Sequence, residues 1–330
     1  MNNSPLISVI IPAYNCEKTI KKTINSVLQQ AFTDFELIVV NDGSQDSTLD
    51  VVGEIHDTRL KVFSFENAGG NVSRNRGLNL AVGNYISFLD ADDIWTPDKL
   101  ESQLEALQKN PEAHVAYSWT DYIDEEDNFL VSGRHVSANG DIYEKLLISN
   151  FLDNGSNPLI SKESLVELEG FDESLKAAQD WDMWLRLAAK YSFVAVTKVQ
   201  ILYRISSHSL SANLTRQEKY CLQVLEKSSH IRPPKNKKTL HLSKANIYKY
   251  LTCKALQEPF SKEKGFLALK YLYRYFLNDY YRKTQVSFLI KILLKILVII
   301  TLPASLSTNL LSKIKLENPK KEFSAIKSRS

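Results

Sequence analysis

The sequence predicts an α/β fold: a mostly parallel central sheet with helices on both faces, followed by a C-terminal helical region. Between residues 6 and 89, short apolar segments alternate four times with segments of helical periodicity, which is typical of parallel sheets. The apolar segments are rich in Val, Ile and Phe, as buried strands are. With 330 residues and 44% hydrophobic content, the chain is long enough for one large α/β domain and a smaller addition.

Each element follows from its local pattern. An apolar run at 6–11, closed by Pro12, predicts the first strand, and apolar residues at helical spacing predict a helix over 16–30. The next expected elements are strands at 35–40, 60–65 and 85–89 and helices at 47–55 and 73–81. They are followed by a helix at 98–109, a strand at 113–119, a solvated acidic loop at 121–127, a helix around Asp180 and closing strands at 193–196 and 199–203.

Charge divides the chain into two parts. Residues 231–330 contain 21 Lys and Arg against 5 Asp and Glu, whereas residues 1–230 contain 20 against 33. This division predicts a domain over 1–215 and a basic helical region over 216–330 with a different task. The three cysteines are widely spaced without a CxxC pair, which favours a reducing compartment, and we expect no signal peptide at the N-terminus.

Polar and acidic residues follow three of the predicted strands. The segments are Pro12-Ala13-Tyr14-Asn15, Asn41-Asp42-Gly43-Ser44 and Asp90-Ala91-Asp92-Asp93. Ligands of open α/β sheets bind beyond the carboxyl ends of the strands, so these residues are expected to line a crevice.

Asp90 and Asp92 place two carboxylates close together, and such a pair favours a hard cation such as Mg²⁺ or Mn²⁺. The alternative is that Asp92 or Asp93 only caps the following helix. Asp42 is a candidate acceptor of hydrogen bonds from a base or a ribose hydroxyl. Its alternative is an Asx-turn, which Asp-Gly sequences favour.

Two further residues carry candidate chemistry. Arg74, with Arg76 beside it near a helix start, is suited to phosphate, although an exposed helix face is the usual place for arginine. Asp180 lies beside aromatic residues, which predicts a raised pKa and a role as general base. The alternative for Asp180 is an acid that opposes the helix dipole.

In order along the chain, six segments resemble the family-2 glycosyltransferases of GT-A fold. They are Ile10–Asn15, Val40–Asp46, Ser73–Gly77, Phe88–Asp93, Gly170–Glu173 and Gln179–Arg186, within a resemblance that covers residues 5–211. The resemblance implies an inverting, metal-dependent hexosyltransferase. Its donor would be a nucleotide-sugar, with UDP expected, and its acceptor a hydroxyl of a saccharide or lipid-linked molecule in cell-surface polysaccharide or glycolipid synthesis.

The resemblance also implies roles for single residues. Pro12, Ala13 and Tyr14 would wall the nucleotide base, Asp42 would bind the base, and Arg74 would contact the donor nucleotide or its diphosphate. Asp90 would touch the ribose or the donor sugar, Asp92 would hold Mn²⁺ or Mg²⁺, and Asp180 would deprotonate the acceptor.

The sequence departs from the family pattern at two places. Gln179 stands where the family usually has Glu before the base, and Tyr203-Arg204-Ile205-Ser206 is followed by His208 two positions late. His208 is therefore a candidate further metal ligand or an exposed loop histidine. The Gln-x-x-Arg-Trp signature of processive synthases is not visible in the sequence, which favours a single transfer per encounter.

Two other classes compete with this interpretation. A nucleotidyltransferase also uses paired aspartates and a divalent ion, but it needs no acceptor-side base. A nucleic-acid-binding protein would explain the basic C-terminal part but not the acidic crevice, so we expect no nucleic acid among the partners.

The segment 285–302 is the most hydrophobic part of the chain and is interrupted by Lys291 and Lys295. Its longest uninterrupted apolar stretch is too short to span a bilayer. An interfacial helix with its lysines toward lipid phosphate fits the pattern, and the alternative is a helix packed on the catalytic domain or on a second subunit. The expected location is cytoplasmic, peripheral on the inner face of the membrane.

Overall fold

The computed structural model describes residues 4–205, 213–279 and 286–311. It divides into two compact units, one formed by residues 1–146 with 150–209 and the other by residues 147–149 with 210–330. The domain boundary expected at 215/216 stays a prediction; it falls near the start of helix α8 (Leu214–Ile231).

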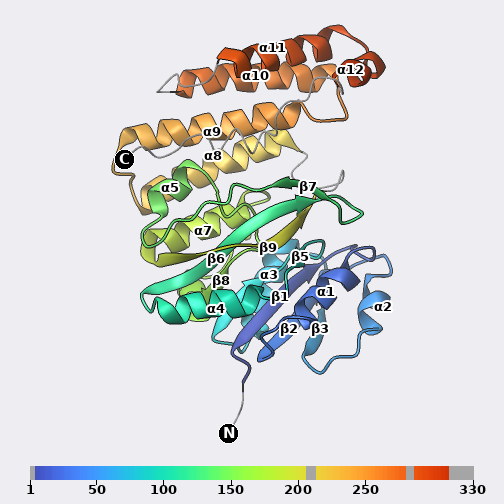
Figure 1. The fold of residues 1–330 in the computed structure, drawn as a ribbon, viewed down its shortest axis with the longest axis vertical. Coiled ribbons are helices and arrows are strands. Elements are labelled where there is room, and N and C mark those ends of the chain that lie inside the picture. The colour runs from blue at the N-terminus through green and yellow to red at the C-terminus, as the bar shows by residue number, and fades with distance from the viewer. Residues whose placement is uncertain (1–3, 206–212, 280–285, 312–330) are drawn as a thin grey trace. The chain divides into compact units, whose positions relative to one another are not determined.

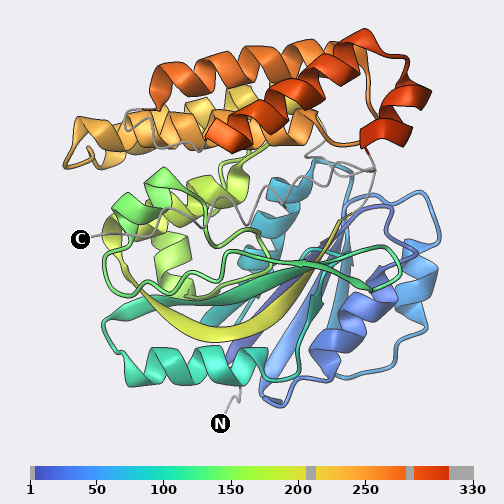
Figure 2. The same cartoon turned by 45° about the horizontal axis from the view of Figure 1, so that its top comes forward.

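The first unit is built on one nine-stranded sheet, which Figures 1 and 2 show from two sides. Its strands are β1 (Ile7–Ala13), β2 (Phe35–Asn41), β3 (Leu60–Ser64), β4 (Tyr85–Phe88), β5 (Ile94–Trp95), β6 (Ala113–Ile123), β7 (Phe129–Ser132), β8 (Leu159–Ser161) and β9 (Ser192–Arg204). The strand order is β3-β2-β1-β4-β8-β6-β9-β5, and β7 pairs with β6.

The sheet is mixed rather than wholly parallel. Strands β3, β2, β1 and β4 are parallel to one another, and β6 is parallel to β9. Strand β8 joins these two groups because it runs antiparallel to both β4 and β6. The predicted α/β class, mostly parallel with helices on both faces, is confirmed.

The helices of the first unit lie between its strands in the chain. They are α1 (Ile20–Leu28), α2 (Thr48–Gly53), α3 (Gly70–Leu80), α4 (Lys99–Lys109), α5 (Tyr143–Ile148, whose last residues belong to the second unit), α6 (Lys162–Glu167) and α7 (Gln179–Lys190). Strand β2 is buried along its whole length, as expected for a strand covered on both faces.

Helix packing explains why the elements form where they do. The apolar residues Ile20, Ile24 and Val27 recur at helical spacing in α1 and are buried in the main core together with residues of α4. Helix α3 packs on β1 and β2, and a Cβ at Gly77 would lie only 2.3 Å from Cγ2 of Ile10. Glycine is therefore needed at that position for α3 to lie this close to the sheet.

Two local predictions were wrong. The segments 193–196 and 199–203 are not separate strands but parts of the single strand β9, whose register against β6 shifts along its length. The solvated loop expected at 121–127 was wrong for 121–123, because β6 continues to Ile123, whereas residues 124–127 form a turn in which Glu125, Glu126 and Asp127 are exposed. Within 121–127, Asp121 binds His135 and Asp127 forms ion pairs with Lys22 and Arg204.

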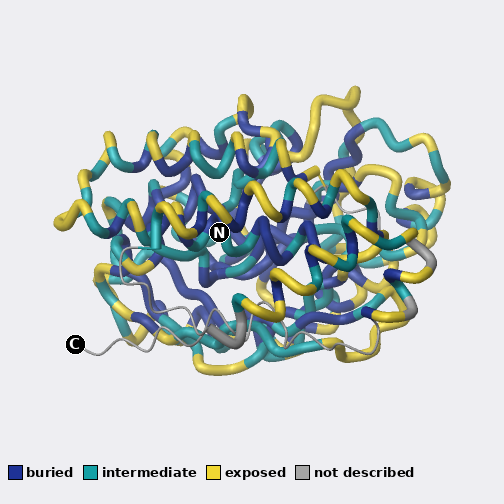
Figure 3. Tube along the Cα trace, turned by 90° about the horizontal axis from the view of Figure 1, so that it is seen from above, coloured by how far each residue is buried: buried dark blue, intermediate teal, exposed yellow. Residues whose placement is uncertain are grey.

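The described part of the second unit is helical. Its helices are α8 (Leu214–Ile231), α9 (Lys237–Ala255), α10 (Lys262–Asn278), α11 (Val286–Thr301) and α12 (Ala304–Leu311). The side chains of Asn213, Asn236 and Ser261 accept backbone N–H groups at the starts of α8, α9 and α10, which fixes where these helices begin. Along the helices, buried and exposed positions alternate with the turn of the helix (Figure 3).

Among the described residues, no helix has both the length and the apolar character needed to cross a bilayer.

Candidate active site

Arg74 and Asp90 join helix α3 to the loop that follows β4. Nη2 of Arg74 donates a hydrogen bond to Oδ1 of Asp90 at 2.5 Å, and the guanidinium lies 5.5 Å from the ring centre of Phe171. Arg74 is only 8% exposed, and its Nε has no hydrogen-bond partner among the described residues. The buried guanidinium of Arg74 is thus held at the end of β4, and its Nε–H is a hydrogen-bond donor that no described residue accepts.

Asp180 lies in the first turn of α7, which begins after Ala178 in a left-handed conformation (φ 58°). The backbone N–H of Trp181 donates to Oδ1 of Asp180 at 2.8 Å. Burial raises the pKa of Asp180 to about 6, and the negative charge of Asp90 adds to this, while Arg74 opposes it. Asp180 therefore lies within electrostatic reach of both Asp90 and Arg74.

Asp92 is partly buried. Burial raises the pKa of Asp92 to about 6, and the neighbouring carboxylate of Asp90 raises it further, against the charges of Arg204 and Arg74. The three carboxylates of Asp90, Asp92 and Asp180 thus lie near the charge of Arg74, and Asp92 also lies near the charge of Arg204. Negative charge prevails at this point of the protein, which favours a cation.

Asp93 and Ser156 fix the loop that carries Asp90 and Asp92. Asp93 is fully buried, and burial, followed by the charges of Asp92 and Asp90, raises its pKa well above the usual range. Its Oδ2 accepts from Oγ of Ser156 at 2.5 Å, and its Oδ1 accepts from the backbone N–H of Arg204 at 3.0 Å. The Ser156 hydroxyl also accepts from the backbone N–H of Asp90 at 3.0 Å. One hydroxyl group therefore binds both Asp90 and Asp93, at the two ends of the loop.

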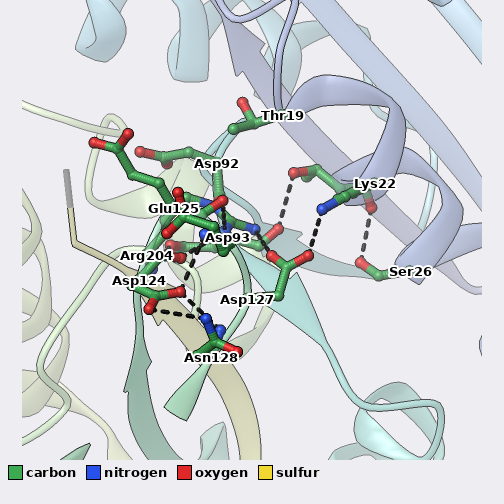
Figure 4. Close-up of polar contacts among 12 residues, drawn as sticks. Thr19, Lys22, Ser26, Asp92, Asp93, Asp124, Glu125, Asp127, Asn128 and Arg204 are labelled. Carbon is green, nitrogen blue, oxygen red and sulfur yellow. Dashed lines mark hydrogen bonds and ion pairs between the residues drawn. The ribbon is translucent and has the colours of Figure 1, made fainter. Parts of the chain in front are cut away.

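The guanidinium of Arg204 connects the same loop to the turn after β6 (Figure 4). Its Nε donates to the carbonyl oxygen of Asp92 at 2.9 Å, and its Nη1 donates to the carbonyl oxygens of Asp124 at 2.8 Å and Glu125 at 3.2 Å. Its Nη2 lies 2.5 Å from Oδ1 of Asp127. The last residue of β9 therefore holds the Asp92 backbone in place.

Sequence reasoning assigned no role to Arg204 or Ser156 and saw Asp93 only as a helix cap. The Tyr203-Arg204 segment was the one signal available for Arg204. No comparable signal exists for Ser156, because its partners lie more than 60 residues away in the chain.

A second group of predicted residues lies at the ends of β1 and β2. The backbone N–H of Asp42 donates to the carbonyl oxygen of Ala13 at 2.8 Å. The carboxylate of Asp42 accepts from the backbone N–H groups of Ala68 at 3.0 Å and Gly69 at 2.8 Å, and Nη1 of Arg76 lies 3.4 Å away. Asp42 is 3% exposed, whereas Tyr14, which follows Pro12 and Ala13, is 50% exposed.

The predicted residues thus fall into two groups. The structure brings together Arg74, Asp90, Asp92 and Asp180, and it places Pro12, Ala13, Tyr14 and Asp42 at the ends of β1 and β2. His208 lies outside the described residues. Within the described ranges, no group of three or more His, Cys, Asp and Glu residues is arranged to hold a metal ion by itself.

Two solved structures are similar to this one. A mannosyltransferase from Pyrobaculum calidifontis in complex with GDP-Man and Mn²⁺ is 20% identical, with a TM-score of 0.59 over 98% of this chain and 84% of that one. Residues 1–349 of S. aureus TarS in complex with UDP-GlcNAc are 17% identical, with a TM-score of 0.55 over 82% of this chain and 88% of that one. These likenesses show a shared fold.

Comparison of sequences shows the family. Residues 8–255 match the family described as glycosyltransferase like family 2. Two Escherichia coli relatives, WfgD and WfaP, are each named UDP-Glc:alpha-D-GlcNAc-diphosphoundecaprenol beta-1,3-glucosyltransferase. WfgD is 34% identical over 67% of this chain and 85% of its own length, and WfaP is 31% identical over 68% and 89%. The chain belongs to the family-2-like glycosyltransferases.

Proposed function

We propose that this glycosyltransferase moves a sugar from a UDP-sugar to a hydroxyl of a lipid-linked saccharide, in a single displacement that inverts the anomeric configuration. The names of WfgD and WfaP specify a UDP-sugar donor and a diphosphoundecaprenol-linked acceptor, and TarS has been solved with UDP-GlcNAc. Acceptors of this kind are consistent with a role in cell-surface polysaccharide or glycolipid synthesis.

The observation that carries the proposal is the environment of Asp180. Its carboxyl group has a pKa of about 6, raised by burial and by Asp90. A carboxylate with this pKa is mostly ionised near neutral pH and is a stronger base than an aspartate in water. Such a group beside Arg74 and Asp90 is suited to remove a proton from an acceptor hydroxyl.

For the donor, we assign the nucleotide to the ends of β1 and β2 and the diphosphate to the Arg74 side. Pro12, Ala13 and Tyr14 would wall the base, and the exposed Tyr14 and partly exposed Pro12 are the parts of this wall that a ligand can reach. Asp42 would contact the base through the small exposed part of its surface. Its two amide bonds also fix the turn that begins α3, the helix that carries Arg74.

Asp92 suits a divalent cation, Mn²⁺ or Mg²⁺. Its carboxylate provides the oxygen ligands that such ions prefer, and its burial beside Asp90 leaves negative charge for a cation to offset. Since the described residues offer no complete ligand cluster, the donor diphosphate and water would supply the other ligands. A cation bound there supplies positive charge beside the departing diphosphate.

The chain's own residues account for the proton and for the orientation of the donor. Asp180 accepts the proton of the acceptor hydroxyl as the acceptor oxygen forms a bond to the anomeric carbon. The bond between the anomeric carbon and the diphosphate oxygen breaks, and its electron pair leaves with UDP. Arg74 holds Asp90 and places a guanidinium beside the developing charge.

Donor binding and product stereochemistry test the proposal. Thermal shifts of the full chain with UDP-, GDP- and dTDP-sugars, with and without Mn²⁺, should show the largest stabilisation for a UDP-sugar. Incubation with that donor and a GlcNAc-diphosphoundecaprenol acceptor should release UDP and give a product of inverted configuration by NMR. Release of pyrophosphate, or a product of retained configuration, would overturn the assignment.

A further inference from the structure

Helix α11 is apolar on two opposite faces. On one face Ile292, Ile296 and Ile299 are buried against the rest of the helical unit. The opposite face carries exposed residues at helical spacing: Ile290, Leu293, Leu294 and Leu297, which are 52%, 46%, 53% and 57% exposed. A helix on a protein surface normally presents polar residues to solvent, so this face is suited to a partner.

Helix α10 has a similar stripe. Its exposed apolar residues are Phe266, Leu269, Tyr273, Phe276 and Leu277, with exposures between 43% and 64%. They recur every three to four residues and therefore lie along one face of the helix. The opposite face carries Ala268, Tyr271 and Tyr275, which are buried.

The two stripes lie on the same side of the helix pair. A Cβ at Gly265, near the start of α10, would lie 2.7 Å from Ile300 and 3.1 Å from Ile299, near the end of α11. The two helices are therefore antiparallel neighbours, as Figure 2 also shows. Successive residues of an α-helix are turned by about 100° about the helix axis. Counted from the residues in contact, the stripes of α10 and α11 are each turned in the same sense about their own helix axis. Because the two helices are antiparallel, this places both stripes on one side of the pair.

Basic residues flank this apolar side. Lys270 follows the α10 stripe along its outer edge, half exposed and with its ammonium 3.7 Å from Oε2 of Glu218, and Lys291 lies exposed beside the α11 stripe. Helix α11 contains two lysines and no acidic residue, and the chain from 231 to 330 has 21 basic against 5 acidic residues. An apolar face with a basic rim is complementary to an anionic lipid surface.

The structure corrects one detail of the expectation drawn from the sequence. Lys295 does not extend beside Lys291, because its ammonium lies 5.4 Å from the ring centre of Phe260, and burial lowers its pKa. Of these two lysines, only Lys291 is available to a headgroup.

We propose that the exposed stripes of α10 and α11 together form a docking surface for an anionic membrane interface. The apolar side chains enter the boundary between headgroups and acyl chains, and the exposed Lys291 contacts lipid phosphate. In this proposal helix α11, of which 16 residues are described, lies along the membrane surface with its exposed stripe toward the lipid. A second copy of this chain fits less well, because it would bring two basic rims together.

Vesicle sedimentation of the full chain tests this without any donor or acceptor. The protein should sediment with vesicles of equal parts phosphatidylglycerol and phosphatidylcholine. The double variant Leu294→Glu/Leu297→Glu should lose at least about tenfold in affinity, because both substitutions place a carboxylate in the lipid-facing stripe. Lys291→Glu should weaken binding to these vesicles and leave the weaker binding to pure phosphatidylcholine unchanged.

A matched control places two glutamates on exposed apolar residues of the first unit. Phe129 and Val166 are 62% and 57% exposed, and Phe129→Glu/Val166→Glu should bind vesicles as the unmodified protein does. Circular dichroism melting verifies that every variant is folded. The proposal is overturned if the unmodified protein stays in the supernatant, if the stripe variant still sediments, or if that variant only converts a dimer to a monomer.

Discussion

The carboxylates that follow β2 and β4 arise from the same sequence pattern, an acidic residue soon after an apolar strand. Their surroundings in the structure are opposite. Asp42, after β2, accepts two backbone N–H groups and lies near Arg76. Asp92, after β4, lies beside Asp90, and burial raises its pKa to about 6. Asp180 joins this second region with a pKa raised in the same way.

The difference shows how two acidic strand ends take different tasks. The carboxylate of Asp42 accepts the backbone N–H groups of Ala68 and Gly69, so Asp42 acts as an anchor for the turn that precedes α3. Burial without enough donors disfavours the charged form, so Asp92 and Asp180 are poised to gain a cation or a proton. Four measurements test this contrast between the two strand ends.

The largest effect is expected for Asp180→Asn. An asparagine cannot accept the acceptor's proton, so kcat should fall by about 10²–10⁴-fold, the usual contribution of a general base. The affinity for UDP, measured by calorimetry, should stay nearly unchanged. Glu101→Gln, at an exposed acid of α4, is the control and should be fully active. Full turnover by Asp180→Asn would remove the base assignment.

Asp92→Asn and Asp42→Asn compare the two strand ends directly. The gain in UDP affinity on adding Mn²⁺ should shrink by about tenfold or more in Asp92→Asn, because a neutral amide replaces the proposed anionic ligand. Asp42→Asn should keep its Mn²⁺ response, even if its overall affinity falls. Equal loss of the Mn²⁺ response in both variants would contradict the division into two regions.

Ser156→Ala probes the support beneath the β4 loop. The substitution leaves Oδ2 of Asp93 and the N–H of Asp90 without the hydroxyl that binds both, and it should lower the free energy of unfolding by about 1–3 kcal/mol. Urea denaturation measures this change. Ser102→Ala, at a partly exposed serine of α4, should change stability by much less. Similar losses in the two variants would mean that the loop does not depend on this contact.

The smallest effect is a pH-dependent gain in stability in Asp180→Asn. The pKa of Asp180 is about 6 in the folded protein and about 4 in an unfolded chain, so ionisation above pH 4–6 destabilises the fold. Removing the carboxyl group should therefore stabilise the protein at pH 8 by about 1–2 kcal/mol, and the gain should disappear near pH 4. Thermal melts at both values test this, and a gain equal at both would contradict it.

Much of the first unit could be predicted from sequence because its signals are local. Apolar runs mark β1, β2 and β4, and the acids after them are adjacent in the chain. The continuity of β9 could not be predicted, because the polar residues between its apolar segments also fit a turn. Likewise, the exposure of both stripes on α10 and α11 could not be derived, since an apolar residue in a helix can face either core or solvent.

Local patterns in the chain are enough to predict the alternation of strands and helices, the family motifs and the acidic residues at the strand ends. The contacts of these acids come from the tertiary fold: Asp42 binds backbone amides, whereas Asp92 and Asp180 are partly buried and have raised pKa values. The fold also brings Arg204, at the end of β9, to the carbonyl oxygen of Asp92, to which its Nε donates a hydrogen bond. Periodicity is encoded between near neighbours, whereas the pKa of a carboxyl group depends on donors and charges that arrive from distant parts of the chain.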